Sequence, residues 1–438
     1  MEQRIRASRY RVSTLGDRQL IGKLVDGPFG TQIKVDDYRK AGIPLLRVSN
    51  CRENEVSDDN LVYIDPKLHA RLSRSEVLPG DVVFTKTGHI LGYAAVFPPR
   101  HDRANMSSHL VLMRTTGQLL PEFLAAYLRT NAGRDQVYRW GQKATKPELN
   151  TIEIRRFLVP VPTPAQQKAL LARLETARAD WKRTLSQADE LLAGIDGIVL
   201  NALGLEMPNP GHASTYAVCF KDVRSAQRIY PDYFHPERMT AIRAVQSRYP
   251  AKQAAKLFEI ADFIRDVKMV DAGDDYLGLA DVQPNTGEKI ASTEEDGKGN
   301  CFVYRKGDVL FARLRPYLNK VYRAESDGVC STEFHVIRIR PGRGGRPGLI
   351  PDYLAAVLRS SILLAQTRHM MTGNTHPRLA NDDVVNLVVP VPNRDVQENI
   401  AREIAHRRAN ARRMRDRAAR IWDEGQRQFE DELLGPAR

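Results

Sequence analysis

The chain carries the same sequence pattern twice, and this duplication limits its fold more than any other feature. PEFLAAYLRT at Pro121–Thr130 matches PDYLAAVLRS at Pro351–Ser360, 230 residues later. The same shift carries LVPVP at Leu158–Pro162 onto VVPVP at Val388–Pro392. Upstream, PGDVVFTK at Pro79–Lys86 matches KGDVLFAR at Lys306–Arg313, 227 residues later. A unit of roughly 200 residues is longer than any solenoid repeat, so each copy should be a domain with an appendage.

In each copy the sequence predicts several strands followed by a helix. Short apolar runs such as IPLLRVSN, DVVFTKTG and LVLMR are separated by Gly, Pro, Asn and Asp, and DYLGLADV, DVLFARL and FHVIRIR follow the same rule in the second copy. This composition is typical of strands and turns. FLAAYLRT and YLAAVLRS then place Leu and Ala at helical spacing. The predicted fold class is therefore mixed α/β (α+β), with a substantial sheet in each copy.

The two proline pairs mark a change from globular domain to long helix. Pro160 and Pro162 end a strand because proline has no N–H for the ladder. Thr163 and Gln166 then form a T-x-x-Q capping box around Pro164 at the first helical position. In the second copy Asn393 can cap the helix and Asp395 lies in its positive first turn.

Apolar residues recur every three or four positions along both predicted helices. The first helix should run from about Thr163 to Leu203, weakened near its end by Gly194 and Gly197; the second should follow Asn393. About 40 residues give roughly 60 Å of helix. So long an apolar seam needs a partner, and we expect the other copy's helix to supply it in an antiparallel coiled coil, although packing of each helix on its own domain is the alternative. The expected partner-binding residues are Leu170, Leu174, Trp181, Leu192, Ile195, Ile400, Ile404, Met414 and Ile421.

Length and composition favour a protein of two or three domains. The 438 residues are 42% hydrophobic and 27% charged, which is typical of globular proteins. No apolar run is long enough to span a membrane, and the first thirty residues lack an apolar signal core. A cytoplasmic protein is expected. Cys51, Cys219, Cys301 and Cys330 form no C-x-x-C pair, so we expect reduced, half-buried thiols and no metal site.

The net charge of +13 favours a polyanionic partner, with nucleic acid as the first candidate. The second long helix adds a basic face, which is either solvated or in contact with DNA phosphates or an acidic protein. This face consists of Arg402, Arg407, Arg408, Arg412, Arg413, Arg415, Arg417 and Arg420.

Searches for catalytic motifs are negative throughout the sequence. There is no P-loop, no G-x-G-x-x-G after a strand, no G-x-S-x-G elbow, and no H-E-x-x-H or H-x-E…C-x-x-C metal motif. PDYFHPER at Pro231–Arg238 lacks the later acidic–x–Lys partner expected of a metal-dependent nuclease, and no short Pro-Pro-aromatic motif of an amino-methyltransferase is present. A binding protein without catalytic residues is therefore favoured.

Five further segments are informative together with the two helix starts: DGPFGTQIKVDDYRKAGIPLLRVSN (Asp26–Asn50), LPGDVVFTKTG (Leu78–Gly88), GDVLFARLRPYLNKV (Gly307–Val321), STEFHVIR (Ser331–Arg338) and YPDYFHPER (Tyr230–Arg238). In these segments the sequence resembles the specificity (S) subunits of type I restriction–modification systems. The resemblance covers nearly the whole chain. Some members of this family have an extra helical segment before the first recognition domain, and here the Asp26 motif starts almost at once.

The resemblance implies a tandem duplication of a target-recognition domain followed by a long spacer helix. Residues 1–162 would be target-recognition domain 1, 163–207 spacer helix 1, 208–392 target-recognition domain 2 and 393–438 spacer helix 2. Each domain would read one half of a bipartite, asymmetric site in double-stranded DNA. The helix pair would set the spacing and dock two methyltransferase (M) subunits, and a restriction/translocase (R) subunit can join such complexes. No cofactor is expected in this chain, because S-adenosylmethionine would bind the partner methyltransferase.

Candidate DNA contacts are polar residues on loops that interrupt strands, since base edges need paired donors or acceptors and phosphates need cations and hydroxyls. The buried GDVxF segments themselves are expected to be core strands. The candidates in the first copy are Lys34, Arg47, Asn50, Arg52, Lys86, Thr87, His89, Ser107, Ser108, His109, Lys143, Thr145 and Lys146. Those in the second copy are Gln283, Asn285, Arg313, Arg315, Tyr317, Asn319, Ser331, Thr332, Asn374, Thr375, His376 and Arg378.

Two other functions stay open from the sequence alone. A stand-alone DNA-binding regulator would share the charge and the duplication, but it would bind specifically without a partner. A self-contained nuclease or methyltransferase would alter DNA by itself, and the missing motifs argue against it.

Overall fold

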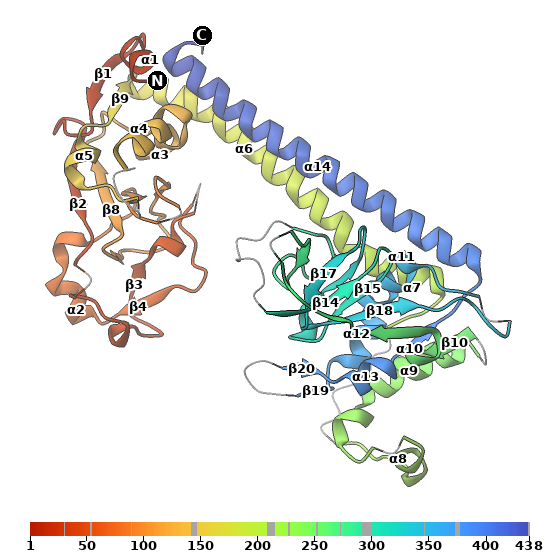
Figure 1. Cartoon of the computed structure of the whole chain (residues 1–438). Coiled ribbons are helices and arrows are strands. Elements are labelled where there is room, and N and C mark those ends of the chain that lie inside the picture. Colours follow the sequence, from red (N-terminus) through yellow and green to blue (C-terminus); the bar gives the residue numbers. More distant parts are fainter. Residues whose placement is uncertain are drawn as a thin grey trace. The chain divides into compact units, whose positions relative to one another are not determined.

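The computed structural model describes residues 1–29, 31–52, 55–88, 90–141, 147–207, 215–226, 228–250, 253–271, 273–290, 299–345, 347–372 and 377–436. These residues form two compact units (Figure 1). Unit 1 comprises Met1–Thr184 and Asp416–Arg438, and unit 2 comprises Leu185–Arg415. Each unit therefore combines one copy of the repeated domain with part of both long helices.

Unit 1 contains short strands with helices between and after them. Its strands are β1 (Arg11–Thr14), β2 (Ile21–Asp26), β3 (Ile43–Leu46), β4 (Val62–Ile64), β5 (Val82–Thr85), β6 (Ala94–Val96), β7 (Asn105–Met106), β8 (Leu110–Thr115) and β9 (Leu158–Val161). Its helices are α1 (Glu2–Arg6), α2 (Pro66–Arg71), α3 (Pro121–Arg129), α4 (Asn131–Gly141) and α5 (Thr151–Arg155), with 3-10 turns η1 (Val35–Asp37), η2 (Val48–Asn50) and η3 (Ser73–Ser75). The long helix α6 (Pro164–Ala193) begins in this unit.

Unit 2 repeats this order with a longer helical start. Its strands are β10 (Ala254–Lys256), β11 (Ala261–Ile264), β12 (Val267–Met269), β13 (Tyr276–Leu277), β14 (Asn300–Tyr304), β15 (Val309–Ala312), β16 (Val321–Arg323), β17 (Gly328–Ser331), β18 (Phe334–Ile339), β19 (Met371–Thr372), β20 (Arg378–Leu379) and β21 (Val388–Pro390). Its helices are α7 (Ile195–Leu203), α8 (Phe220–Ala226), α9 (Pro236–Arg248), α10 (Leu257–Ile260), α11 (Pro351–Arg359), α12 (Ser361–Thr367) and α13 (Asn381–Val385), with 3-10 turns η4 (Pro231–Phe234) and η6 (Pro316–Leu318). The helix α14 (Arg394–Leu434) begins in unit 2 and ends in unit 1.

The same four-stranded antiparallel sheet lies at the centre of each unit. The strand order is β2-β8-β5-β6 in unit 1 and β11-β18-β15-β16 in unit 2. Val82 and Phe84 of β5 pack on α3, whereas Val83 faces a second apolar cluster on the opposite side of the sheet. Because alternate residues of a strand face opposite sides, a strand buried on both faces is apolar throughout. This confirms that the repeated GDVxF segments are core strands.

The second sheet differs between the units. Unit 1 has the three-stranded order β4-β3-β7, and unit 2 has the four-stranded order β12-β14-β17-β13. Both retain one parallel pair, β3 with β7 and β13 with β17. The central sheet has therefore been kept after duplication, while this outer sheet has been rebuilt.

Buried polar side chains at matching positions hold the main chain in both units. The side-chain amide of Gln136 accepts from Leu158 N at 2.7 Å and donates to Leu158 O at 3.1 Å. Gln366 makes the same pair of bonds to Val388. Buried polar groups are costly unless they are satisfied, so each glutamine pins the strand before the proline pair.

A second pair of glutamines fixes the start of each long helix. Gln167 Nε2 donates to the carbonyl of Pro162 at 2.8 Å, and its Oε1 accepts from Leu120 N at 2.8 Å. Gln397 repeats this arrangement with Pro392 O and Ile350 N. The strand, the prolines and the helix therefore form one hydrogen-bonded corner in each copy.

The long helices begin as the sequence predicts. Thr163 and Gln166 exchange the two hydrogen bonds of a capping box, and the Asn393 side chain accepts from Val396 N at 3.1 Å. One detail of the prediction is wrong, because the first helix is not continuous to Leu203. It is divided into α6 and α7 at Gly194, a residue with low helix propensity.

The apolar seams of α6 and α14 pack on each other within each unit, in opposite chain directions (Figure 1). In unit 1 the rings of Trp181 and Trp422 stack at 5.5 Å, and Gly425 allows close approach to Ala177. In unit 2 Leu192 and Ile195 share a cluster with Ile400 and Ile404. The seam prediction is thus confirmed for an intramolecular helix partner, and Leu170, Leu174, Trp181 and Met414 also join these clusters, with Ile421 half-buried.

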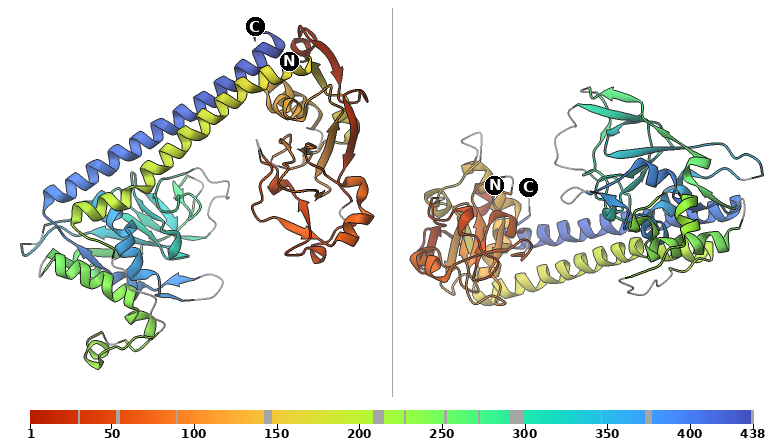
Figure 2. Two further views of the ribbon diagram at one scale, coloured as in Figure 1. Left: turned by 180° about the vertical axis from the view of Figure 1, so that it is seen from behind. Right: turned by 90° about the horizontal axis from the view of Figure 1, so that it is seen from below.

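Each domain also receives a carboxylate from the helix that returns to it. Glu430 of α14 accepts from Ala132 N at 3.1 Å at the start of α4, and Asp196 of α7 accepts from Ser361 N at 2.8 Å at the start of α12. A carboxylate at this position satisfies free N–H groups and the helix dipole. In unit 1, Arg4 further joins the chain start to the end of α14 through Glu430 and Asp431, so the two termini are neighbours (Figure 2).

The four cysteines are unpaired, as predicted. Cys51, Cys301 and Cys330 are buried more fully than expected, and Cys219 is exposed. Desolvation raises the pKa of Cys51 and of Cys330 to about 12, so neither is a ready nucleophile at neutral pH. Within the described part of the chain, the helices are too short or too polar to cross a bilayer.

Candidate nucleic-acid interface

Several predicted DNA contacts of unit 1 meet at one corner of the central sheet. The segment after β5 lies between the start of β8 and the segment before α5: Lys86 N donates to His109 O at 3.0 Å, and Leu149 N donates to Lys86 O at 2.9 Å. Thr87 Oγ1 and His109 Nδ1 are 2.9 Å apart. Ser107 and Ser108 lie in the turn before β8. We call this region, residues 86–88, 107–109 and 147–149, the first corner.

Unit 2 has the same corner built from the corresponding main chain. Arg313 N donates to Glu333 O at 2.9 Å, and Leu379 N donates to Arg313 O at 2.9 Å. Arg315 N is held by Pro377 O at 2.7 Å. Ser331 ends β17, and Thr332 lies in the turn before β18. We call this region, residues 313–315, 331–333 and 377–379, the second corner.

The two corners match in backbone and differ in side chains. Lys86, Thr87, His109 and Glu148 correspond to Arg313, Leu314, Glu333 and Arg378. In the first corner Lys86 lies 3.1 Å from Asp26 and 3.5 Å from Glu148. In the second corner Arg378 pairs with Glu333 at 2.7 Å, and this hydrogen bond raises the pKa of Arg378. One frame therefore presents two different sets of donors and acceptors.

Glycine is required beside the first corner because two backbones approach closely there. Gly27 N donates to Leu110 O at 3.0 Å, and a Cβ on Gly27 would lie 2.0 Å from Ser107 O. No ordinary contact is that short, so any side chain would displace the turn that carries Ser107 and Ser108.

Arg315 is an exposed cation of the second corner. Its backbone is left-handed, with φ of 49°, which is uncommon for a residue other than glycine. No ion pair to its guanidinium is found among the described residues. Tyr317, on the same loop, is 49% exposed. A strained backbone that holds a free arginine in solvent is the kind of local cost found at functional sites.

Comparisons with known proteins give one consistent result, although no family model matches the sequence. The chain is 23% identical over 174 residues to the type I restriction enzyme EcoBI specificity subunit of Escherichia coli, covering 39% of this chain and 36% of that protein. It is 22% identical over 296 residues to the EcoDI specificity subunit of the same organism, covering 65% of this chain and 62% of that protein. In sequence, this chain is similar to type I restriction enzyme specificity subunits. The resemblance predicted from the motifs is confirmed, and the chain spans less than two thirds of the length of these relatives.

A solved structure has the same fold along nearly the whole chain. It is described as the structural basis underlying complex assembly and conformational transition of the type I R-M system. The match has a TM-score of 0.51 at 15% identity and covers 98% of both chains. The predicted fold class, a duplicated mixed-sheet domain with long paired helices, is thereby confirmed.

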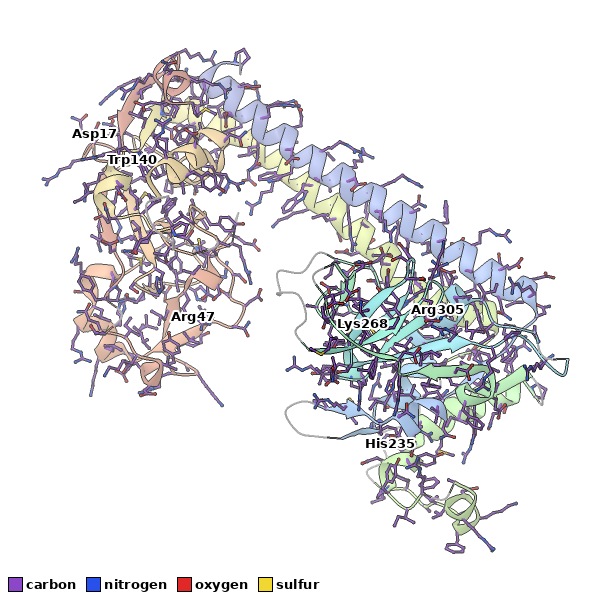
Figure 3. All side chains as sticks on the ribbon, in the orientation of Figure 1. Asp17, Arg47, Trp140, His235, Lys268 and Arg305 are labelled. Atoms are coloured by element: carbon purple, nitrogen blue, oxygen red, sulfur yellow. The ribbon has the colours of Figure 1, made fainter. Side chains whose placement is uncertain are left out.

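The other described candidates of unit 1 lie on segments beside the strands of the outer sheet, not in the first corner. Arg47 donates to Asn60 O at 2.5 Å and lies over Tyr38, and it is labelled in Figure 3. Arg52 lies 3.8 Å from Asp59, and Lys34 is exposed before η1. These three cations stay predictions. The prediction that Asn50 contacts DNA is wrong. Asn50 is fully buried, and its amide donates to the carbonyls of Ser57 and Asp59 rather than facing solvent.

The loop of Gln283 and Asn285 lies beside the loop that carries Tyr317. Asn285 N donates to the carbonyls of Leu318 and Asn319, and Asn285 also borders a cavity with residues of α11 and α7. The DNA contacts of Gln283 and Asn285 stay predictions, whereas that of Asn319 needs correction. Asn319 is 7% exposed and its side chain donates to Arg359 O at 2.7 Å. A base contact by Asn319 does not fit this placement, because its amide is already used to hold the end of α11.

Seven candidates lie outside the described residues: His89, Lys143, Thr145, Lys146, Asn374, Thr375 and His376. Conversely, sequence reasoning missed the corner carboxylates Glu148 and Glu333, and Asp26, which lies 3.1 Å from Lys86 beside the first corner. The alignment of the two copies could have found Glu148 and Glu333, since they occupy positions matching Arg378 and His109.

Sequence reasoning also missed His335, a buried histidine behind the second corner. It is 6% exposed and borders a cavity of about 200 Å³ with Arg313 and Asn381. Burial, followed by the nearby Arg313 charge, lowers the pKa of His335 to about 4, so it is neutral at pH 7. The matching residue in unit 1 is Val111.

The basic face of α14 is partly used within unit 2. Arg408 and Arg412 pair with the buried Glu288, Arg407 pairs with Glu403, and Arg415 pairs with Asp189. Arg402, Arg417 and Arg420 are exposed. At least four of the eight arginines therefore have partners in the chain, which favours neither a fully solvated face nor a continuous phosphate-binding face.

Proposed function

We propose that this chain is the non-catalytic DNA-specificity subunit of a type I restriction–modification complex. Each unit reads one half of a bipartite, asymmetric site in double-stranded DNA through its corner and the adjoining loops. The observation that carries the proposal is the pair of corners, which combine one backbone frame with different side chains. Together with the similarity to specificity subunits, this is what a duplicated reader of two unlike half-sites requires.

The side chains of each corner suit base reading of different kinds. Arginine matches guanine O6 and N7, and carboxylates accept from the cytosine amino group. Arg315 and Arg378 therefore favour guanine in the half-site of unit 2. Thr87, His109 and Glu148 present hydroxyl, imidazole and carboxylate groups to the half-site of unit 1. The net charge of +13 supplies the general attraction to phosphates.

The long helices are proposed to set the gap between the half-sites and to dock two methyltransferase subunits. These subunits would hold S-adenosylmethionine and carry out methyl transfer, and a restriction/translocase subunit can join them. The 41 residues of α14 span about 60 Å, which is long compared with one DNA turn of about 34 Å.

Reconstitution tests the proposal directly. The purified chain is combined with the methyltransferase subunit of its own system, and methylated adenines are mapped on genomic DNA. Methylation at one bipartite motif that disappears without this chain is the expected result. Methyl transfer or cleavage by the chain alone, or tight specific binding with no effect on methylation, would overturn it.

A paired deletion tests the role of the helices. Residues 175–181 and 422–428 face each other in unit 1, with Trp181 against Trp422 and Ala177 against Gly425. Removing both segments shortens each helix by seven residues, about 10 Å, and should shorten the gap by up to about three base pairs. The half-site letters should not change, and a changed half-site with an unchanged gap would contradict the proposed spacing role.

A further inference from the structure

Two histidines and a buried glutamate meet where α9 begins and α12 ends. His235 immediately precedes α9, Glu237 is in its first turn, and His369 follows α12. One possible ligand atom from each of these residues lies within 4.8 Å of the others. Glu237 is 8% exposed and both histidines are half-buried. Figure 3 labels His235 at the start of α9.

The hydrogen bonds of this group show which atoms an ion would use: the Nε2 of His235, and the two atoms of the bond between His369 and Glu237, which the ion would replace. His235 Nδ1 accepts from Glu237 N at 3.3 Å, so its Nε2 is not needed to cap the helix. His369 Nε2 lies 2.7 Å from Glu237 Oε2. The other carboxylate oxygen, Oε1, accepts from Arg368. Glu237 is therefore oriented by Arg368 in the way that outer-shell partners orient metal ligands.

Two imidazole rings are also packed face to face beside this carboxylate. The ring centroids of His235 and His369 are 3.4 Å apart, with 17° between the planes. Two imidazoles and one carboxylate are a ligand set that proteins use for zinc.

The corresponding place in unit 1 contains no histidine among its described residues. His369 corresponds to Arg139, by the shift of 230 residues that relates the two copies. Arg139 of α4 pairs with Glu2 of α1 at 2.6 Å, and α1 packs on β9 as α9 packs on β21. In unit 1 an arginine–glutamate pair therefore suffices to join these elements. Joining the elements does not by itself explain why unit 2 has two histidines at this place.

We propose that His235, Glu237 and His369 form a binding site for a divalent transition-metal ion of the zinc type, which fastens the start of α9 to the end of α12. The ion takes Glu237 Oε2 and one nitrogen of each ring, and a water completes four-coordination. Binding at the usual distance of about 2.0–2.1 Å turns the rings out of their stack toward a common point. Arg368 keeps Oε1, and its side chain is 48% exposed, so solvent screens its charge from the ion.

Zinc titration of the full-length chain tests this site. The chain is stripped with a chelator, and Zn²⁺ binding is measured by calorimetry, with Co²⁺ absorption as a second readout of coordination geometry. One equivalent per chain should bind in the wild type. His369→Arg places the unit 1 residue at this position, so it retains a partner for Glu237 while removing a ligand. His101→Gln is the control, since His101 pairs with Asp58 in unit 1.

His369→Arg and His235→Gln should weaken Zn²⁺ binding by more than the ~10–100-fold typical of a lost outer-shell partner, and His101→Gln should leave it unchanged. The wild type should also gain thermal stability with Zn²⁺, and His369→Arg should not. Absence of a stoichiometric site in the wild type, or equal binding by folded His369→Arg, would overturn the proposal and leave the group as an ion pair.

Discussion

The two units keep the same main-chain frame and differ in what that frame presents to solvent. Side chains that bond the main chain are retained at matching positions: Gln136 and Gln366, Gln167 and Gln397, and the buried carboxylates Asp81 and Asp308, which accept from Leu78 N and Arg305 N. Side chains at the corners have changed from Lys86 and His109 to Arg313 and Glu333. After duplication, groups whose loss would leave buried main chain unsatisfied were retained, whereas groups facing solvent changed.

The largest expected effect is the loss of stability when a retained buried carboxylate is removed, and it should be the same in both units. Asp81 accepts two bonds from Arg114, and Asp308 accepts two from Arg338; both aspartates are 2% exposed. Asp81→Ala and Asp308→Ala should each lower the free energy of unfolding of their own unit by about 3 kcal/mol, because each leaves an arginine without its buried partner. Amide hydrogen exchange resolved by unit measures both.

A matched surface variant sharpens this result. Asp58 pairs with Arg100 and His101, but the carboxylate is 46% exposed. Asp58→Ala should therefore change the stability of unit 1 by less than about 1 kcal/mol. Equal losses of stability for Asp58→Ala and Asp81→Ala would show that burial of the carboxylate does not determine how much its ion pair stabilises unit 1.

The next largest effect is a difference between the two units in the pH dependence of their stability. The folded-state pKa of His335 lies near 4, below the value of about 6.5 in an unfolded chain, and unit 1 has Val111 at this position. The stability of unit 2 is not reduced by His335 above pH 6.5, where this residue is neutral in both the folded and the unfolded chain. Stability is lost as the pH falls toward 4, because the unfolded chain binds a proton that the folded chain does not. Unit 2 should lose about 2 to 3 kcal/mol between pH 7 and pH 4.5 from this group alone.

His335→Val provides the control for the pH effect. The variant should remove that part of the pH dependence of unit 2 and leave unit 1 unchanged, as measured by denaturant unfolding or amide exchange at both pH values. An identical pH slope for the variant and the wild type would rule out His335 as the source.

Arg315 should show opposite effects on stability and binding. Arg315→Gly relieves a left-handed backbone and should stabilise unit 2 by about 1 kcal/mol. The same change, and Arg315→Gln, should weaken binding of the cognate DNA by roughly tenfold, since one base contact is worth ~1–3 kcal/mol. Arg243→Gln on α9 is the matched control for charge, and an equal loss with it would reduce the Arg315 effect to general electrostatics.

The smallest effect concerns the helix-to-domain caps. Asp196→Ala should lower the stability of unit 2 by about 1 kcal/mol, the usual value of a lost N-terminal cap. Asp189→Ala removes only the exposed pair with Arg415 and should have an effect of a few tenths of a kcal/mol. Thermal unfolding of both variants side by side distinguishes the two cases.

The sequence alone predicted those parts of the molecule that depend on periodicity and local chemistry. Repeated GDVxF strands, helix caps at Thr163 and Asn393, and the apolar seams follow from alternation, capping and three-to-four spacing. It did not predict that Asn50 and Asn319 are buried, because a polar residue after a strand looks the same whether it faces solvent or holds a neighbouring carbonyl. Nor did it predict the corner carboxylates or the approach of His235 to His369, since these depend on pairings between segments far apart in the chain.

The most direct test of two independent readers is a comparison of methylation motifs. The complete system is reconstituted with wild-type chain, with the first-corner variant Thr87→Ala/His109→Ala, and with the second-corner variant Arg315→Gln, and methylated sites are mapped for each. Each variant should relax the letters of one half-site only, a different half for each, while the gap stays the same. Changes in the same half with both variants, or in both halves with either one, would contradict the account.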